Sequence, residues 1–157
     1  MRRHDATRDA LARWLKTRNI TVSKEQSVPS WDTDAERAIL DLWVVDPDTS
    51  APVYVDVSII ASATHSCTPV TTLLARRERT KHLRYPGTSL VPFVMDARGR
   101  WGNEAIAWAK GLLRHKSPAD RQEALWALRW EVAQALHTAV AEQCLTSFLG
   151  CQSRKHG

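Results

Sequence analysis

The fold is decided by AILDLWVV at residues 38–45, DPDTSA at 46–51 and PVYVDVSII at 52–60. Apolar, β-branched and aromatic residues dominate the first and third segments, which predicts two strands, and the middle segment carries strong turn chemistry. The strands are therefore expected to form an antiparallel hairpin. Each strand contains one acid, Asp41 or Asp56, and burying an acid in an apolar strand is costly unless a cation compensates it. The hairpin is expected to set the two acids close together.

A divalent metal ion is the leading candidate for that cation, because carboxylate oxygens are the ligands that Mg²⁺ prefers. The residues by themselves leave an alternative open: an acid at a strand end, or one paired with a nearby arginine, needs no metal. His65 and Cys67 follow in a threonine-rich segment. They are not expected to be ligands, because no second ligand pair accompanies them.

Periodicity and turn signals predict the elements around the hairpin. They are an amphipathic helix over 5–18, strands over 23–28, 37–45, 52–60 and 90–95, helices from Pro69 to about 85–87 and over 104–113, a long helix over 118–149, and a flexible tail over 150–157. This order predicts an α/β fold with a mixed central sheet flanked by helices. The length of 157 residues suits one domain, expected over 1–149 with its core over 3–115.

The formal net charge of +5 suggests a polyanionic partner, and the positive charge lies in two clusters. They are Arg2, Arg3, Arg8, Arg13, Lys16, Arg18 and Lys24 near the start, and Arg76, Arg77, Arg79, Lys81 and Arg84 further along. Three cysteines without CxxC spacing and the lack of an apolar leader predict reduced thiols and an intracellular protein, nuclear if the source is a eukaryote. Apolar runs are too short to span a bilayer, so no membrane partner is expected.

Six short segments between residues 2 and 115 carry a resemblance. They are Arg3-His4-Asp5 followed by Arg8 to Leu11, Lys24-Glu25-Gln26, Leu40-Asp41-Leu42, Val55-Asp56-Val57-Ser58, Lys81-His82-Leu83-Arg84-Tyr85, and Val91-Pro92-Phe93-Val94 before the loop with Gly99, Trp101 and Gly102. Their order and wording resemble the endonuclease domain of site-specific non-LTR retrotransposons, which has the restriction-endonuclease-like, or PD-(D/E)xK, fold. The resemblance implies an αβββαβ core, to which the long C-terminal helix is an addition.

The resemblance also implies a catalytic site. Asp41 and Asp56 would be ligands for Mg²⁺ or Mn²⁺, and Glu25 would be a third ligand or would polarise a water. Many nucleases of this fold carry a lysine two residues after the second acid, where this chain has Ser58. Lys81 is expected to supply that positive charge from the following helix and to stabilise charge on the phosphate.

DNA is the expected partner, together with a reverse transcriptase of the same element. The DNA contacts are expected from Arg3, His4, Arg8, Arg77, Arg84 and Tyr85, mainly to the phosphate backbone, which positions DNA without reading its sequence. Trp31 and Trp101, both in predicted loops, are candidates for stacking on bases.

The sequence thus predicts a metal-dependent DNA endonuclease that nicks one strand. The alternative is a nuclease-fold module that has lost its chemistry and binds nucleic acid without cleaving it, which Ser58 and Leu40 favour. A third hypothesis, a helical interaction protein that docks through 118–149, ranks last because the same apolar residues are explained by packing on the sheet.

Overall fold

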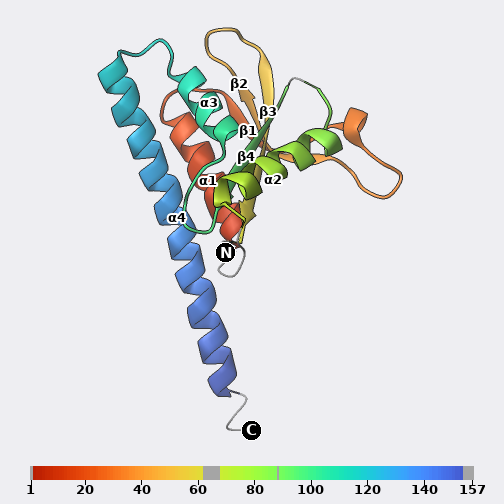
Figure 1. The fold of residues 1–157 in the computed structure, drawn as a ribbon, viewed down its shortest axis with the longest axis vertical. Helices are drawn as coiled ribbons and strands as arrows, with labels where there is room; N and C mark the ends of the chain where they lie inside the picture. Colours follow the sequence, from red (N-terminus) through yellow and green to blue (C-terminus); the bar gives the residue numbers. More distant parts are fainter. Residues whose placement is uncertain (1, 62–67, 88, 154–157) are drawn as a thin grey trace.

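A computed structural model describes residues 2–61, 68–87 and 89–153, and for 149–153 it describes the backbone alone. The elements are α1 (Arg3–Lys16), β1 (Val22–Ser27), the short 3₁₀ helix η1 (Pro29–Trp31), β2 (Ile39–Val45), β3 (Pro52–Ile60), α2 (Val70–Arg84), β4 (Leu90–Asp96), α3 (Asn103–Leu112) and α4 (Pro118–Ser153). Figure 1 shows a sheet with helices around it and α4 running past α1 and beyond the rest of the protein.

The four strands form one mixed sheet in the order β1-β2-β3-β4. The first two pairs are antiparallel, and β3 pairs with β4 in parallel across the connection through α2. This arrangement confirms the predicted α/β class, the mixed sheet flanked by helices and the long C-terminal helix.

The hairpin of β2 and β3 forms as the turn residues predict. Asp46 accepts hydrogen bonds from the backbone N–H groups of Asp48 and Thr49, and Ser50 adopts a left-handed backbone conformation with φ of 56°. Arg114 donates to both Asp46 oxygens, at 2.8 and 3.0 Å, and these hydrogen bonds lower the pKa of Asp46 to about 2. A distant arginine therefore clamps a turn whose chemistry is otherwise local.

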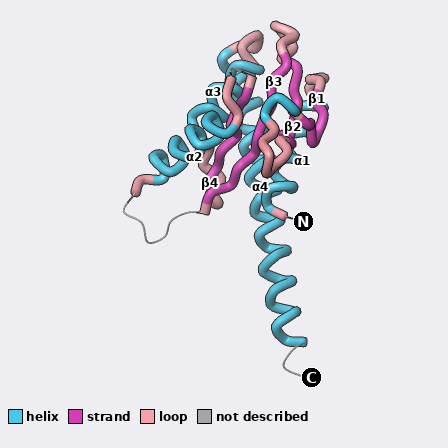
Figure 2. Tube along the Cα trace, turned by 90° about the vertical axis from the view of Figure 1, so that its right-hand side faces the viewer, coloured by secondary structure: helices cyan, strands magenta, loops and turns pink. Residues whose placement is uncertain are grey.

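The main hydrophobic core lies between one face of the sheet and the helices α1, α3 and α4. Its fully buried members include Leu11, Trp14 and Leu15 of α1, Leu42 and Val44 of β2, Val55 of β3, Phe93 and Met95 of β4, and Leu128 and Leu136 of α4. Alternation along the strands sends Asp56 and Ser58 to the opposite face, where α2 packs. Figure 2 shows α2 beside β4, away from α4.

Several predicted boundaries are corrected by the structure. The first helix begins at Arg3 and ends at Lys16, and β2 begins at Ile39. The last helix continues to Ser153, so 150–153 are helical, whereas a tail was expected from 150; residues 154–157 lie outside the described residues, as do His65 and Cys67. None of the helices that the structure describes is both long and apolar enough to cross a membrane.

The two tryptophans proposed for base stacking are engaged within the fold. Trp31 contacts the rings of Tyr54 and Tyr85 and donates its indole N–H to the carbonyl of Pro86 at 2.9 Å. Trp101 is buried against Phe93. Their positions in the sequence suggested exposed loops, but both rings pack against other aromatic rings of the fold.

Gly102 provides a test of the packing between α2 and α3. A Cβ at this position would collide with the carboxylate of Glu78, a buried side chain of α2 that accepts a hydrogen bond from the backbone N–H of Glu104. We expect Gly102→Ala to lower the free energy of unfolding by about 1–3 kcal/mol through overpacking, measured by urea denaturation.

Gly111, in the last turn of α3, is the matched control, because a Cβ there meets no atom within 4 Å apart from its chain neighbours and the backbone of its own helix. Gly111→Ala is expected to raise the free energy of unfolding by about 0.5–1 kcal/mol, as alanine does in a helix interior. Equal effects of the two substitutions would contradict the packing described here.

Candidate functional site

An open groove of about 760 Å³ lies where the start of β2, the end of β3 and α2 meet the N-terminus of α1. Its lining residues are Arg2, Arg3, His4, Ile39, Asp41, the β3 segment from Asp56 to Ile60, Ala61, Arg77, Lys81 and Gln143. Three of the four residues predicted to be catalytic, Asp41, Asp56 and Lys81, therefore line one groove. The fourth, Glu25, lies elsewhere.

The two acids lie on neighbouring strands, just beyond the end of the strand pairing. The pairing of β2 with β3 runs from Val45↔Pro52 to Leu42↔Val55, and Asp41 and Asp56 are the residues next to that last pair. The Asp41 carboxylate accepts the backbone N–H of Val57 at 2.7 Å. This hydrogen bond ties the Asp41 side chain to β3 next to Asp56, and the charge of Asp41 acts on Asp56.

His4 holds the same carboxylate from α1. Its Nε2 donates to Oδ2 of Asp41 at 3.0 Å, and its Nδ1 lies 3.3 Å from the carboxylate of Asp5. The hydrogen bond to Asp41, despite partial burial, raises the pKa of His4 to about 9. The imidazole is therefore cationic at neutral pH, and Asp41 accepts a charge-assisted hydrogen bond.

Asp56 is the more deeply buried acid. Its Oδ2 lies 2.6 Å from the Lys81 ammonium, and the side chains are 7% and 16% exposed. Burial raises the pKa of Asp56, the nearby Asp41 charge raises it further, and Lys81 and Arg77 oppose the rise. A buried carboxylate with a second one beside it needs cationic compensation, and here Lys81 provides part of it.

The cations reach this face of β3 from one side of α2. Arg77 and Lys81 are four residues apart and hence one helical turn apart, while Ser58 and Asp56 are two residues apart on one face of the strand. Lys81 meets Asp56, and Arg77 donates from Nε to Oγ of Ser58 at 3.4 Å. One turn of α2 therefore spans about the same distance as two residues of β3, so both cations meet a polar side chain of the strand.

Glu25 does not join the groove. Its side chain is 65% exposed and forms an ion pair of 2.8 Å with Arg8, and its backbone has a φ of 57°. The strand register would place Glu25 opposite Asp41, but the pairing of β1 with β2 passes from Lys24↔Leu42 to Gln26↔Leu40 without it. The expected role of Glu25 as a third ligand finds no support in this geometry.

The residues expected to contact DNA divide into two groups. Arg3, His4 and Arg77 line the groove. Arg8 is largely buried and pairs with Asp9 and Glu25.

Arg84 and Tyr85 are also engaged away from the groove. Arg84 binds Glu36 and the carbonyl of Trp31, each at 3.2 Å. Tyr85 is buried, and burial raises the pKa of its phenol. The sequence showed that Arg84 is charged and Tyr85 aromatic, but it did not show the residues that they contact in the folded protein.

Two of the polar residues that line the groove were not among the predicted site residues. Arg2, the residue before α1, is one of them, and its neighbours in the basic run were a signal for it. Gln143 comes from α4. It had no sequence signal, because it lies 87 residues from Asp56 and the packing of α4 on α1 brings it to the groove.

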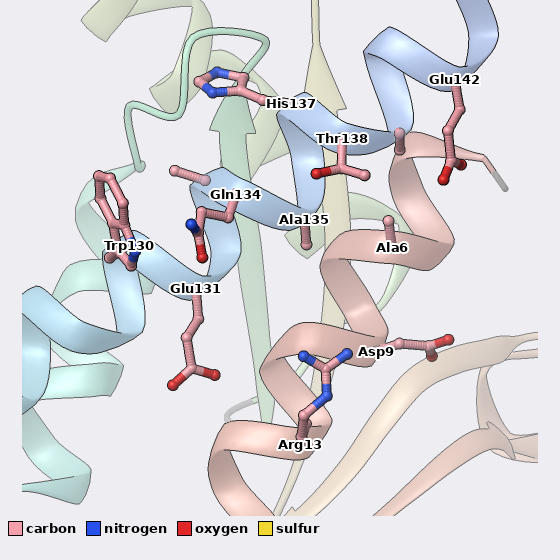
Figure 3. A pocket seen from close by; sticks show the side chains of 12 residues that line it. Ala6, Asp9, Arg13, Trp130, Glu131, Gln134, Ala135, His137, Thr138 and Glu142 are labelled. Atoms are coloured by element: carbon pink, nitrogen blue, oxygen red, sulfur yellow. The ribbon is translucent and has the colours of Figure 1, made fainter.

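A second hollow of about 710 Å³ lies between α1 and α4 (Figure 3). Asp9 and Arg13 of α1 and Trp130 and Glu131 of α4 are among its lining residues. Asp9 is already bound by Arg8 and Lys24, at 3.1 and 3.2 Å. This hollow has no acid pair with a facing lysine, so the groove at Asp41 and Asp56 is the better candidate site.

The donor chemistry of the groove fits a small divalent cation. Asp41 and Asp56 both line the groove with carboxylate oxygens. Burial, and to a smaller extent the charge of Asp41, raises the pKa of Asp56, so a further cation in the groove would stabilise its ionised form. Among residues 2–61, 68–87 and 89–153, no group of three or more histidine, cysteine or acidic side chains is arranged to hold a metal. Any such ion would therefore take its remaining ligands from water, backbone or substrate, as Mg²⁺ commonly does.

No family model matches the chain, and no curated protein matches it. The fold and site define it as an α/β protein with a four-stranded mixed sheet and an acid pair in an open, cation-lined groove.

The contact between His4 and Asp41 predicts an unusual titration. The folded-state pKa of His4 is about 9, above the ordinary value of 6.5, so the contact stabilises the fold fully below pH 6.5 and is lost as the pH rises through about 9. In metal-free protein, NMR titration of the His4 ring should show this high pKa.

Asp41→Asn removes the charge that holds the proton, so the pKa of His4 should fall toward 6.5 in that variant. A His4 ring that titrates near 6.5 in the unaltered protein would contradict the contact.

Proposed function

We propose that this protein is a metal-dependent DNA endonuclease of the restriction-endonuclease-like class, which nicks a DNA strand. The observation that carries the proposal is the Lys81 ammonium, 2.6 Å from the Asp56 carboxylate in the groove that Asp41 also lines. The resemblance of the sequence to the endonucleases of site-specific non-LTR retrotransposons supports it. In that setting the enzyme would act with the reverse transcriptase of its element, which would extend the nicked strand.

The acid pair and the cations bound to it each have a role in the proposed reaction. Asp41 and Asp56 would hold Mg²⁺ or Mn²⁺, with Asp41 oriented by His4 and by the N–H of Val57. When bound, the ion would offset phosphate charge and lower the pKa of the attacking water. Lys81 would keep Asp56 ionised and stabilise the negative charge that develops on the phosphoryl oxygens.

Electrostatics favour a polyanionic substrate in this groove. Arg2, Arg3, Arg77, Lys81 and protonated His4 line it, against the two carboxylates Asp41 and Asp56. The excess of positive charge attracts a phosphate backbone, and the open shape suits a duplex better than an enclosed small molecule.

Nicking of supercoiled plasmid tests the proposal directly. Purified protein should convert supercoiled to open-circular DNA with Mg²⁺ or Mn²⁺, and EDTA should stop the reaction. Protein that binds DNA but never nicks it with either ion would overturn the proposal.

The second candidate is a module that binds nucleic acid without cleaving it. The observation that favours it is the internal pairing of both acids, Asp41 with His4 and Asp56 with Lys81, since these cations already compensate the charge. Titration calorimetry separates the two: the nuclease should bind Mg²⁺ or Mn²⁺ at the acid pair, and Asp56→Asn should abolish the signal. A module without chemistry shows salt-dependent DNA affinity and no such signal.

A further inference from the structure

We infer that Ser58 is an anchor for Arg77, and that Arg77 so anchored binds a phosphate of the DNA strand in the groove. The inference deepens the proposed function and rests on it for the identity of the ligand. It assigns a task to Ser58, the position at which many nucleases of the restriction-endonuclease-like fold carry lysine.

The geometry of the pair carries the first step. Ser58 is 5% exposed, lies on the same face of β3 as Asp56, and has its Oγ 3.4 Å from Nε of Arg77. An arginine engaged through Nε keeps the four N–H bonds of its two terminal nitrogens for another acceptor. Those nitrogens form a planar fork that matches two phosphate oxygens, a geometry that a lysine does not have.

The surroundings of Arg77 carry the second step. Arg77 is an exposed residue of α2 and lines the groove, unlike Arg8 and Arg84, whose guanidinium groups are bound to acids. Its hydrogen-bond partner Ser58 lies two residues from Asp56 on the same face of β3, and all three residues line the groove. A phosphate bound by the Arg77 fork would therefore lie beside the acid pair.

The two cations of α2 then have different tasks. Lys81 forms an ion pair with Asp56 and compensates its charge, whereas Arg77 donates a hydrogen bond to the neutral hydroxyl of Ser58. A neutral partner holds the guanidinium in place without cancelling its charge. Arg77 thus remains available to bind an anion, and Ser58 is its positioning residue.

Binding of a short fluorescein-labelled DNA duplex, measured by anisotropy over a range of salt concentrations without divalent ions, tests the inference. Removing one phosphate contact lowers the slope of log affinity against log salt by about 0.9 in magnitude. Arg77→Ala should show this loss together with an affinity about tenfold weaker, typical of one charge-assisted contact. Arg77→Lys should keep the slope and still lose affinity, because it keeps the charge without the fork.

Variants of Ser58 test whether the hydroxyl positions Arg77, because they leave the charge of Arg77 unchanged. Ser58→Ala should leave the salt slope unchanged and weaken binding several-fold, whereas Ser58→Thr, which retains the hydroxyl, should bind as the unaltered protein does. Arg79→Ala is the helix control, since Arg79 lies on α2 but not in the groove. Its effect on affinity should be smaller than that of Arg77→Ala.

The outcomes distinguish this inference from the proposed nuclease activity. Suppose that the protein never nicks DNA, but Arg77→Ala lowers the salt slope and Ser58→Ala lowers the affinity for DNA. The anchoring of Arg77 by Ser58 would then be supported, and the proposed nuclease activity would be refuted. An unchanged slope with Arg77→Ala, or equal affinities for Ser58→Ala and Ser58→Thr, would overturn the inference even if the protein nicks. Absence of DNA binding by the unaltered protein would overturn both.

Discussion

Asp56→Asn is expected to reduce metal-dependent nicking by about 10³-fold, near the upper end of what loss of one electrostatic stabiliser costs. Asparagine has nearly the same shape but removes the negative charge that would bind the ion. It also leaves the Lys81 ammonium, only 16% exposed, without its counter-charge. The measurement is the initial rate of plasmid nicking at several Mg²⁺ and Mn²⁺ concentrations.

Folding must be separated from chemistry in this experiment, because an unpaired buried charge destabilises a protein. Circular dichroism and thermal melting of Asp56→Asn provide the check. Asp9→Asn is the matched control: Asp9 pairs with Arg8 and Lys24 but does not line the groove, so its loss should leave nicking within about twofold of the unaltered rate, as expected for a pair outside the site. A folded Asp56→Asn protein that nicks at the unaltered rate would refute the assigned site.

Lys81→Met should lower nicking by about 10²–10³-fold, because the site loses the cation beside Asp56. The loss has a second consequence. Burial and the charge of Asp41 raise the pKa of Asp56, and Lys81 lowers it. Without Lys81 the pKa of Asp56 therefore rises further. Since Asp56 must be ionised to hold a metal, the residual activity should move to higher pH.

Ser58→Lys in the Lys81→Met protein is the informative companion variant. Position 58 lies on the same face of β3 as Asp56 and faces α2, so a lysine there returns a cation to the acid pair from the strand. We expect recovery of at least about tenfold in rate, the effect of restoring roughly 1.4 kcal/mol of transition-state stabilisation. Recovery should be incomplete, because Arg77 loses its hydroxyl acceptor.

Arg79→Met is the control for Lys81→Met, as an exposed cation of α2 outside the groove. It should nick at close to the unaltered rate. Full activity of Lys81→Met would show that the charge beside Asp56 is dispensable, and the assignment of Lys81 would then be wrong.

Local sequence patterns were sufficient for the hairpin and for the order of elements. Apolar, β-branched and aromatic residues in 38–45 and 52–60, with the turn chemistry between them, determine which strands form and that Asp41 and Asp56 share a sheet. The same local rules predicted helices within a few residues of α1, α2 and α3. They were less reliable at the end of α4, where a glycine suggested a tail and the helix continues.

The composition of the site depended on contacts between residues distant in sequence. Glu25, Arg8 and Arg84 looked available because a sequence shows a charge but not its partner, and each has one in the fold. His4 and Gln143 reach the groove through the docking of α1 and α4, which depends on the whole core and not on any local motif.

The sequence by itself determined that two acids lie in adjacent strands of a helix-flanked mixed sheet, because strand period and turn chemistry act over a few residues. Only the tertiary structure decided that Lys81 meets Asp56 and Arg77 meets Ser58. The physical reason is that the rotation of α2 about its axis is set by packing against β4, with residues such as Leu74 buried beneath it. That packing turns one side of the helix toward the acids, and no pattern within the helix specifies it.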